Sequence, residues 1–278
     1  PSEVVQPRQG TKYYPRPYLS FFLMKILLSP AKRMAASSAS YSMVGVPTQA
    51  LFQKEIAQVL APLRALSPRE LAPLMDISPR IAEQSWQYHQ EISLPLNEKN
   101  AKEALFAYRG DVYDGLDADT LSSEEVLWLQ DRLRILSGLY GIVRPLDLIA
   151  PYRLEMGTKL SVAGKATLYE FWEEKLTQAL KNELEKDEPV VNLASDQYTK
   201  VINRKKLPVP VVDIVFKNWK GDTLKTIVLY TKRARGLMVR YIAQERVTTL
   251  EQLKGFQKGG YHFSEELSHE KKLVFVGG

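Results

Sequence analysis

Residues 133–157 (LRILSGLYGIVRPLDLIAPYRLEMG) constrain the fold more than any other part of this chain. Charged residues occur singly in an apolar run, unlike in a surface helix or loop, and Gly138 and Gly141 lie three residues apart. Two interpretations stay open. The segment is either a buried helix, turn and strand, or an anion site in which glycine N–H groups act together with Arg144 and Arg153.

An amphipathic helix is predicted over residues 122–136, directly before the two glycines. Ser-Ser-Glu-Glu is typical of a helix start, and the apolar residues that follow recur at helical spacing. A helix, a glycine turn and a second apolar segment resemble the helix–hairpin–helix module, whose N–H groups contact phosphate without reading bases. The glycines are three apart rather than two, and Pro145 restricts the second helix. We nevertheless expect Gly138 and Gly141 to supply N–H donors.

The absence of cysteine excludes several kinds of chemistry. The 278 residues contain no Cys, which rules out disulfides, thiol catalysis, iron–sulfur clusters and Cys-ligated zinc and suits a reducing cytoplasm. The three histidines, His89, His262 and His269, lack metal-ligand spacing. No stretch reaches the roughly 20 apolar residues of a membrane span. We predict no metal and no other cofactor.

Positive charge is concentrated in one segment. Residues 200–240 hold 11 Lys or Arg and two Asp, a net charge of +9, so the rest of the chain carries −3 of the overall +6. This asymmetry indicates a polyanionic partner: nucleic acid, an anionic membrane or a phosphorylated ligand. A solvated basic face is the alternative. The candidate binding residues of this segment are Lys232, Arg233, Arg235 and Arg240.

The remaining patterns predict one mixed α/β domain over residues 24–278, preceded by a Pro-rich extension over residues 1–23. Residues 24–28, 189–194, 260–263 and 272–276 read as strands, residues 209–216 and 223–230 as a hairpin, and residues 265–270 as an acidic loop. Residues 35–47 read as a loop. Helices are predicted over residues 48–60, 78–90, 98–107 and 168–184, with another starting at Ser67.

Polar residues in otherwise apolar surroundings support a second hypothesis. Lys32 and Ser195 each follow a predicted strand, where ligands collect in open α/β sheets. Ser195 lacks a nearby His or a Gly-x-Ser-x-Gly elbow and is better explained as a helix N-cap. The set that could converge on a pocket for a small phosphorylated or carboxylated ligand is Lys32, Arg109, Asp111, Asp147, Arg153, Glu155, Ser195 and Asp196.

From residue 24 onward the sequence resembles the YaaA family of bacterial peroxide-stress proteins. The resemblance depends on five blocks in the family's order: KILLSPAK, YRGDVYDGL, LRILSGLYGIVRPLDLIAPYRLEMG, NLASDQYTK and YTKRARGLMVRYI. It implies a cytoplasmic protein that limits oxidative damage to DNA, associated with low free iron and with DNA binding. It also implies a single mixed α/β domain with a positively charged cleft and a helix–hairpin–helix-like element.

Residues and resemblance together favour a DNA-binding protein with no evident protein or membrane partner. We expect a basic cleft to bind the backbone of duplex or structured DNA with little sequence specificity. Its side chains would be Lys32, Arg144, Arg153, Lys232, Arg233, Arg235 and Arg240. An enzyme acting on a small anionic substrate is the main alternative. Iron sequestration by Asp, Glu and His is a third, for which the sequence offers no clustered ligands.

Overall fold

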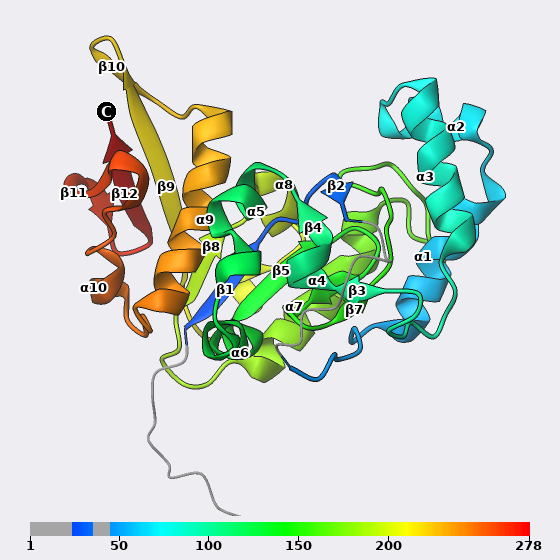
Figure 1. The fold of residues 1–278 in the computed structure, drawn as a ribbon, viewed down its shortest axis with the longest axis horizontal. Coiled ribbons are helices and arrows are strands. Elements are labelled where there is room, and N and C mark those ends of the chain that lie inside the picture. Colours follow the sequence, from blue (N-terminus) through cyan, green and yellow to red (C-terminus); the bar gives the residue numbers. More distant parts are fainter. Residues whose placement is uncertain (1–23, 36–44) are drawn as a thin grey trace, which may run out of the picture.

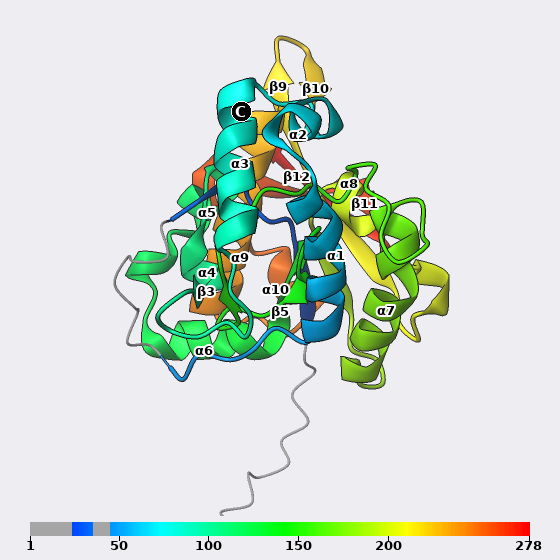
Figure 2. The same ribbon diagram turned by 90° about the vertical axis from the view of Figure 1, so that its right-hand side faces the viewer.

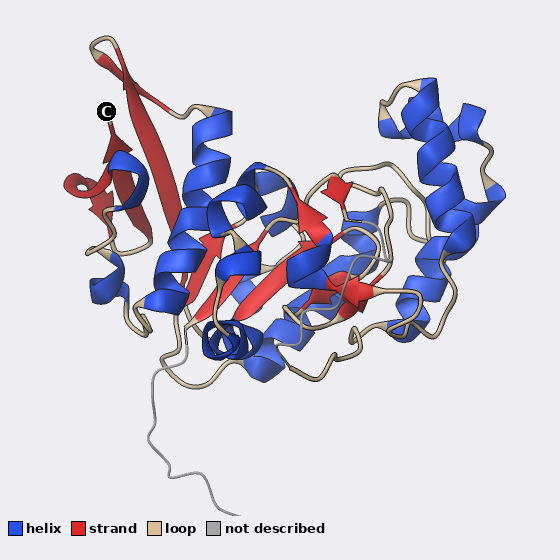
Figure 3. Ribbon diagram, in the orientation of Figure 1, coloured by secondary structure: helices blue, strands red, loops and turns tan. Residues whose placement is uncertain are grey.

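The computed structural model describes residues 24–35 and 45–278. The predicted extension over residues 1–23 and most of the loop expected over residues 35–47 lie outside the described residues. The described chain forms a mixed α/β structure, with helices packed around one eight-stranded sheet (Figure 1, Figure 3). The predicted fold class is confirmed. Across the same ranges, no helix is both long and apolar enough to cross a membrane.

Parallel strands form the centre of the sheet. The strand order is β11-β12-β9-β8-β1-β5-β6, with β10 paired to β9, and every neighbouring pair from β12 to β5 is parallel. Because helices cover the sheet, its central strands are mostly apolar and are buried along their whole length. The strands are β1 (Lys25–Leu28), β5 (Leu133–Ser137), β6 (Gly141–Val143), β8 (Val190–Leu193), β9 (Val211–Lys220), β10 (Thr223–Lys225), β11 (Tyr261–His269) and β12 (Lys272–Gly277).

Helices cover both sides of the sheet. Figure 2 shows α5 and α6 on one side and α7 on the other, while α1, α2 and α3 form a group of their own at one end of the molecule. The helices are α1 (Gln53–Ala65), α2 (Pro68–Met75), α3 (Pro79–Glu91), α4 (Ala104–Ala107), α5 (Asp111–Leu116), α6 (Ser123–Arg132), α7 (Leu168–Glu183), α8 (Asp196–Thr199), α9 (Val228–Gln244) and α10 (Leu250–Leu253).

Two small two-stranded sheets join distant parts of the chain. β2 (Arg33–Met34) pairs with β4 (Tyr108–Arg109), and β3 (Lys102–Glu103) pairs with β7 (Leu148–Ile149), both antiparallel. The first of these pairs brings the segment after β1 against the start of α5. The residues that the sequence marked separately near positions 32 and 109 therefore lie side by side.

Several predicted boundaries are wrong. The helix expected over residues 122–136 ends at Arg132, because the next five residues, all buried, form β5 beside β1. The helix expected over residues 98–107 is reduced to α4, preceded by the short strand β3. The strand expected over residues 223–230 ends at Lys225, before α9. Most of the acidic loop over residues 265–270 continues β11.

Two glycines allow α5 and α9 to cross in close contact. A Cβ atom on Gly236 would lie 1.8 Å from the carbonyl oxygen of Val112, and one on Gly115 would lie 2.2 Å from that of Arg233. Both neighbours are backbone, so a side chain at either position would push the helices apart. This crossing fixes the first turns of α9 beside the start of α5, where the candidate site lies.

Candidate anion-binding pocket

The carboxyl ends of β1 and β8 open into a pocket of about 290 Å³. The two strands are parallel neighbours, so the residues that follow them meet at one edge of the sheet, the usual place for ligands in open α/β sheets. Ser29 and Lys32 come from the segment after β1, and Ser195 and Gln197 from the segment after β8. The charged residues that line the pocket are Lys32, Arg33, Arg109, Lys232 and Arg235 with Asp111 and Glu155.

Hydrogen bonds between the two strand ends form the floor of the pocket. The Ser195 backbone N–H donates to Ser29 Oγ at 2.9 Å, and the buried hydroxyl of Tyr113 donates to the Ser29 carbonyl at 3.0 Å. Ser195 stands at the N-cap position of α8, as predicted, but its side chain makes no capping hydrogen bond and lies 3.4 Å from Ser29 Oγ. No histidine is among the described residues lining the pocket, so Ser195 is not part of a Ser–His pair there.

Three of the five basic residues have an acidic partner. Lys32 Nζ lies 2.5 Å from a carboxylate oxygen of Glu155, and Lys232 Nζ lies 3.9 Å from Asp111. Arg109 pairs at 3.4 Å with Asp119, an exposed residue of the segment after α5. Among the described residues, no acidic side chain forms an ion pair with either remaining arginine of the pocket.

Arg33 and Arg109 lie directly opposite each other in the β2–β4 pair. Opposed residues of an antiparallel pair point to the same side, and like charges in that position repel. Gly110 follows Arg109 with a φ of +129°, a conformation that other residues rarely adopt. The chain therefore turns sharply into α5 and leaves two guanidinium groups at one side of the pocket.

Arg235 brings a third guanidinium from α9. Its side chain is partly buried, and its Nε atom is buried with no hydrogen-bond partner in the described protein. Burial lowers the pKa of Arg235, and the negative charge of Asp196 opposes that shift. A buried donor without an acceptor is costly, so an acceptor supplied from outside the chain would be well bound here.

The other basic residues predicted on α9 have different places. Arg233 lines a second, larger hollow of about 620 Å³ with Tyr230 and Tyr261. Arg240 Nη1 donates to the carbonyl oxygens of Leu116 and Asp117, both at 3.0 Å, and to Thr120 Oγ1 at 2.8 Å. Arg240 therefore holds α9 against the end of α5.

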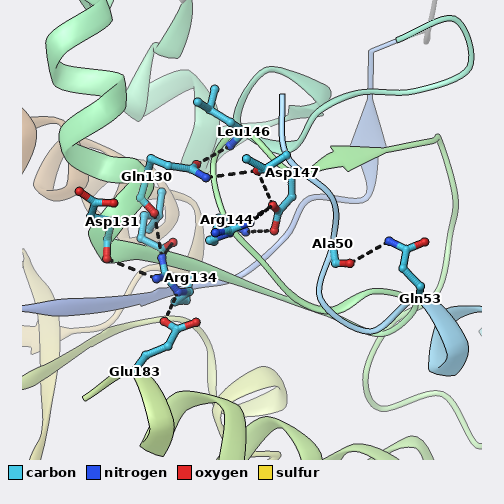
Figure 4. Close-up of polar contacts among 11 residues, drawn as sticks. Ala50, Gln53, Gln130, Asp131, Arg134, Arg144, Leu146, Asp147 and Glu183 are labelled. Atoms are coloured by element: carbon cyan, nitrogen blue, oxygen red, sulfur yellow. Dashed lines mark hydrogen bonds and ion pairs between the residues drawn. The ribbon is translucent and has the colours of Figure 1, made fainter. Parts of the chain in front are cut away.

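Arg144 does not join the pocket either. Asp147 is buried and accepts hydrogen bonds from Arg144 Nε at 3.2 Å, from Arg144 Nη2 at 3.0 Å and from the Arg144 backbone N–H at 2.7 Å (Figure 4). Because β6 runs back along β5, Arg144 lies at the amino end of the parallel strands. The hypothesis that Arg144 and Lys32 line one cleft is wrong, since they stand at opposite edges of the sheet.

The glycines of residues 133–157 have a structural role. Gly138 and Gly141 are buried in the turn between β5 and β6, so they are not presented to a ligand. A Cβ on Gly141, whose φ is +73°, would lie 2.8 Å from the ring of Trp172. Trp172 Nε1 donates to the Gly138 carbonyl at 2.9 Å. The prediction of a helix–hairpin–helix element at this point is wrong, because a strand precedes the turn and another follows it.

Two helices joined by a tight turn do occur elsewhere, at α2 and α3. The Ile77 N–H donates to the Ala72 carbonyl at 3.0 Å, and Asp76 adopts a left-handed conformation with φ of 51°. Ser78 Oγ accepts from the Ile81 N–H at 3.4 Å, as its N-cap position predicted. The sequence indicates the two helix starts but not their pairing, because Asp76 stands where such a turn usually has glycine.

The α2–α3 hairpin is tied to the segment before the pocket. His89 of α3 is fully buried, and its Nε2 lies 3.1 Å from the Arg153 carbonyl oxygen, which makes Nε2 the protonated nitrogen. Burial lowers the pKa of His89 to about 4; the Arg153 hydrogen bond opposes the shift. The Arg153 side chain lines a small hollow beside the pocket with Lys32 and Glu155.

Five of the eight polar residues predicted to converge do so. Lys32, Arg109, Asp111, Glu155 and Ser195 line the pocket. Arg153 lies in the adjoining hollow, whereas Asp147 pairs with Arg144 at the opposite edge of the sheet. Burial lowers the pKa of Arg235 in the pocket, and the negative charge of Asp196 partly offsets this lowering. Arg33 was missed, because its importance depends on pairing with a residue distant in sequence. Within the described ranges, no three His, Cys, Asp or Glu residues gather as metal ligands would.

Comparisons with known proteins agree with this sequence pattern. A family model described as "Peroxide stress protein YaaA" matches residues 24–267. A UPF0246 protein of Flavobacterium psychrophilum is 43% identical over 253 residues, covering 91% of this chain and 100% of the relative. UPF0246 proteins of Flavobacterium johnsoniae and Acaryochloris marina are 44% and 43% identical, each over 91% of this chain and at least 99% of the relative. The chain therefore belongs to the peroxide stress protein YaaA family, and this membership supports a role in peroxide stress.

Proposed function

We propose that this protein binds the backbone of DNA with little sequence specificity during peroxide stress and protects it from iron-dependent oxidative damage. The observation that carries the proposal is the opposition of Arg33 and Arg109 across β2 and β4. Like charges in that position repel each other, and Arg109 alone of the two has an ion pair among the described residues, with Asp119, so an anion bound between the guanidinium groups would relieve the repulsion. Lys232 and Arg235 add positive charge from the other side of the pocket.

The α2–α3 hairpin offers a second contact with the same partner. Arg69 and Arg80 stand in the first turns of the two helices, exposed and without an ion pair in the described protein. Contacts of basic side chains with phosphate fix the position of a protein on a duplex but read no bases. The hairpin and the elements around the pocket all lie on the upper side of the molecule in Figure 1, so one extended polyanion could contact both.

Protection follows from the physics of the DNA counterion layer. The backbone concentrates cations, and Fe²⁺ held there reacts with peroxide beside the bases. Each phosphate that a Lys or Arg neutralises releases its counterions. Bound protein would therefore lower the amount of iron on the covered backbone without itself holding a metal ion.

A salt series on a fluorescent duplex tests the proposal. With about five phosphate contacts, the logarithm of affinity falls with the logarithm of salt concentration at a slope of roughly −4 to −5. The double variant Arg33→Ala, Lys232→Ala removes two exposed basic side chains that line the pocket, so its slope should be flatter by about two. Duplex sequence should change affinity little.

A charge-matched control separates a local site from general attraction. Lys181→Ala, Lys186→Ala removes two charges just before β8, at the amino edge of the sheet and away from the pocket. The proposal requires this variant to bind as the wild type does. Equal weakening of both double variants, or a wild-type slope near zero, would contradict a backbone site at the pocket.

An enzyme acting on a small phosphorylated or carboxylated substrate is the second candidate. One observation favours it: Asp111 and Glu155 share a small pocket with the basic residues and with the Ser29 and Ser195 hydroxyls. Such a pocket is typical of small-molecule sites. Incubation with nucleoside monophosphates and sugar phosphates, followed by chromatography, tests for turnover. Product that forms with the wild type and not with Asp111→Asn would favour the enzyme.

A further inference from the structure

We propose that the pocket at the ends of β1 and β8 binds a phosphomonoester, a phosphate group attached through a single ester bond. The inference rests on the proposed function, since it names the chemical group that the basic pocket holds. Two sources carry this group: a free small ester such as a mononucleotide, and the 5′-phosphate at the end of a DNA strand. The internal phosphodiesters of an unbroken backbone do not.

Three guanidinium groups line the pocket. Arg33 and Arg109 come from paired strands in direct opposition, and Arg235 comes from α9 with a buried Nε that has no hydrogen-bond partner among the described residues. Guanidinium forks match the oxygen atoms of phosphate in two-point hydrogen bonds. A group held between them would relieve the repulsion of Arg33 and Arg109 and give Arg235 the acceptor that it lacks.

The balance of charge in the pocket suits a dianion. Five basic side chains face two carboxylates, and each carboxylate lies beside a lysine: Glu155 at 2.5 Å from Lys32, and Asp111 at 3.9 Å from Lys232. The lysines screen these carboxylates, and Asp119 pairs with Arg109, so among the described residues Arg33 and Arg235 are the pocket arginines without an ion pair. A phosphomonoester carries close to two negative charges at neutral pH, whereas each backbone diester carries one.

The size and walls of the pocket favour a chain end or a small molecule. At about 290 Å³ it lies at the lower limit of small-molecule sites. The lining of the pocket also includes three apolar residues, Pro30, Ala31 and Val112. Their side chains would contact the organic part of the ester, which inorganic phosphate lacks.

Binding of matched oligonucleotides tests the proposal. The same short single strand, labelled at its 3′ end, is prepared with a 5′-phosphate and with a 5′-hydroxyl, and anisotropy is measured at one salt concentration. If the strand end is the source, the phosphorylated strand binds about tenfold tighter or more, as one strong charge-assisted contact would give. If the free ester is the source, the two strands bind equally, but AMP binds in calorimetry and adenosine does not.

Two variants show whether the preference for the 5′-phosphorylated strand, or for AMP over adenosine, depends on the pocket. Arg33→Gln removes an exposed guanidinium and should abolish the preference for phosphate, and Arg235→Lys keeps the charge but loses the fork and should reduce it severalfold. Lys186→Gln, at the other edge of the sheet, should leave it intact. Circular dichroism of each variant checks that the fold is kept. A preference that persists in both pocket variants would overturn the proposal.

The outcome also separates this inference from the proposed function. If both strands bind equally and AMP binds no better than adenosine, the phosphomonoester site is overturned, while salt-dependent binding of the strands still supports a backbone site. If AMP binds but neither strand nor duplex does, the pocket assignment stands and the DNA-binding function fails.

Discussion

Two groups of arginines in this protein differ in how completely their donors are used. The framework arginines, Arg134, Arg144 and Arg240, are held by carboxylates and carbonyl groups of the chain itself. Arg134, for example, donates to Glu183 at 2.6 Å and to the carbonyl oxygens of Gln130 and Leu133 (Figure 4). Within residues 24–35 and 45–278, the pocket arginines, Arg33, Arg109 and Arg235, have one ion pair among them, from Arg109 to Asp119. A structural arginine is therefore distinguished from a candidate ligand-binding arginine by its hydrogen-bond and ion-pair partners in the fold, since the residue type is the same.

The largest expected effect is a loss of stability when the crossing of α5 and α9, which positions the pocket arginines, is disturbed. Gly236→Ala would place a Cβ against the Val112 carbonyl, where neither backbone can yield without moving α9 away from α5. We expect a loss of more than about 3 kcal/mol in the free energy of unfolding, above the usual cost of overpacking. Urea denaturation measures it.

Gln244→Ala is the control for that prediction, because it adds alanine to an exposed position of the same helix. It should leave stability nearly unchanged. If Gly236→Ala is as stable as this control, the helices do not depend on the close glycine contact.

Acid should destabilise the fold through the buried side chain of His89. The pKa of buried His89 is about 4 in the folded protein, below the value of about 6.5 in an unfolded chain. The unfolded state therefore binds the proton more readily. The contribution of neutral His89 is complete above pH 6.5 and is lost as the pH falls toward 4, by roughly 3 kcal/mol. Urea denaturation between pH 7 and pH 4 measures this loss.

A His89→Gln variant shows whether the acid sensitivity belongs to this side chain. Its amide can still donate to the Arg153 carbonyl but does not titrate. It should start less stable than the wild type at pH 7 and lose less on acidification. A pH profile parallel to that of the wild type would mean that carboxylates, not His89, set the acid limit.

Asp147→Asn tests the framework group at a single pair. The buried carboxylate accepts from Thr48 Oγ1 at 2.6 Å as well as from Arg144, and the substitution removes its charge while keeping its shape. Hydrogen bonds to a charged group contribute about 1.5–3 kcal/mol, so we expect a loss of about 2 kcal/mol in urea denaturation. DNA affinity of the folded fraction should not change. Weaker DNA binding would show that Arg144 belongs with the pocket group after all.

The sequence was sufficient to predict structure where the residues of a single segment determine its conformation. The Ser-Pro helix starts, the strand over residues 24–28 and the rule that ligands collect beyond parallel strands placed Lys32 and Ser195 at one edge correctly. It was insufficient where pairing with a segment distant in sequence determines the conformation. Leu133 and Leu136 fit a helical period, but pairing with β1 makes their segment a strand.

The same limit applies to the site. Arg144 and Asp147 are three residues apart, and this spacing alone could have indicated that the two side chains form an ion pair. Nothing local indicates that Arg33 opposes Arg109, since their strands are short and far apart in sequence. The charge count of residues 200–240 located a basic segment, but could not separate Arg235, which lines the pocket, from Arg240, whose donors are used.

The smallest expected effect is a change in stability that should have opposite signs for the framework arginines and for the pocket arginines. Removing a framework charge should destabilise the protein, whereas Arg33→Gln removes one of two opposed like charges on β2 and β4 and should stabilise it by about 0.5 kcal/mol. A small shift in the urea midpoint at constant slope would show this. Added phosphate ester should then raise the midpoint of the wild type more than that of the variant, because at a given concentration a ligand stabilises the folded state more when it binds more tightly. If Arg33→Gln is instead less stable than the wild type without any ligand, Arg33 belongs to the framework, and the opposition of the two arginines carries no information about a bound anion.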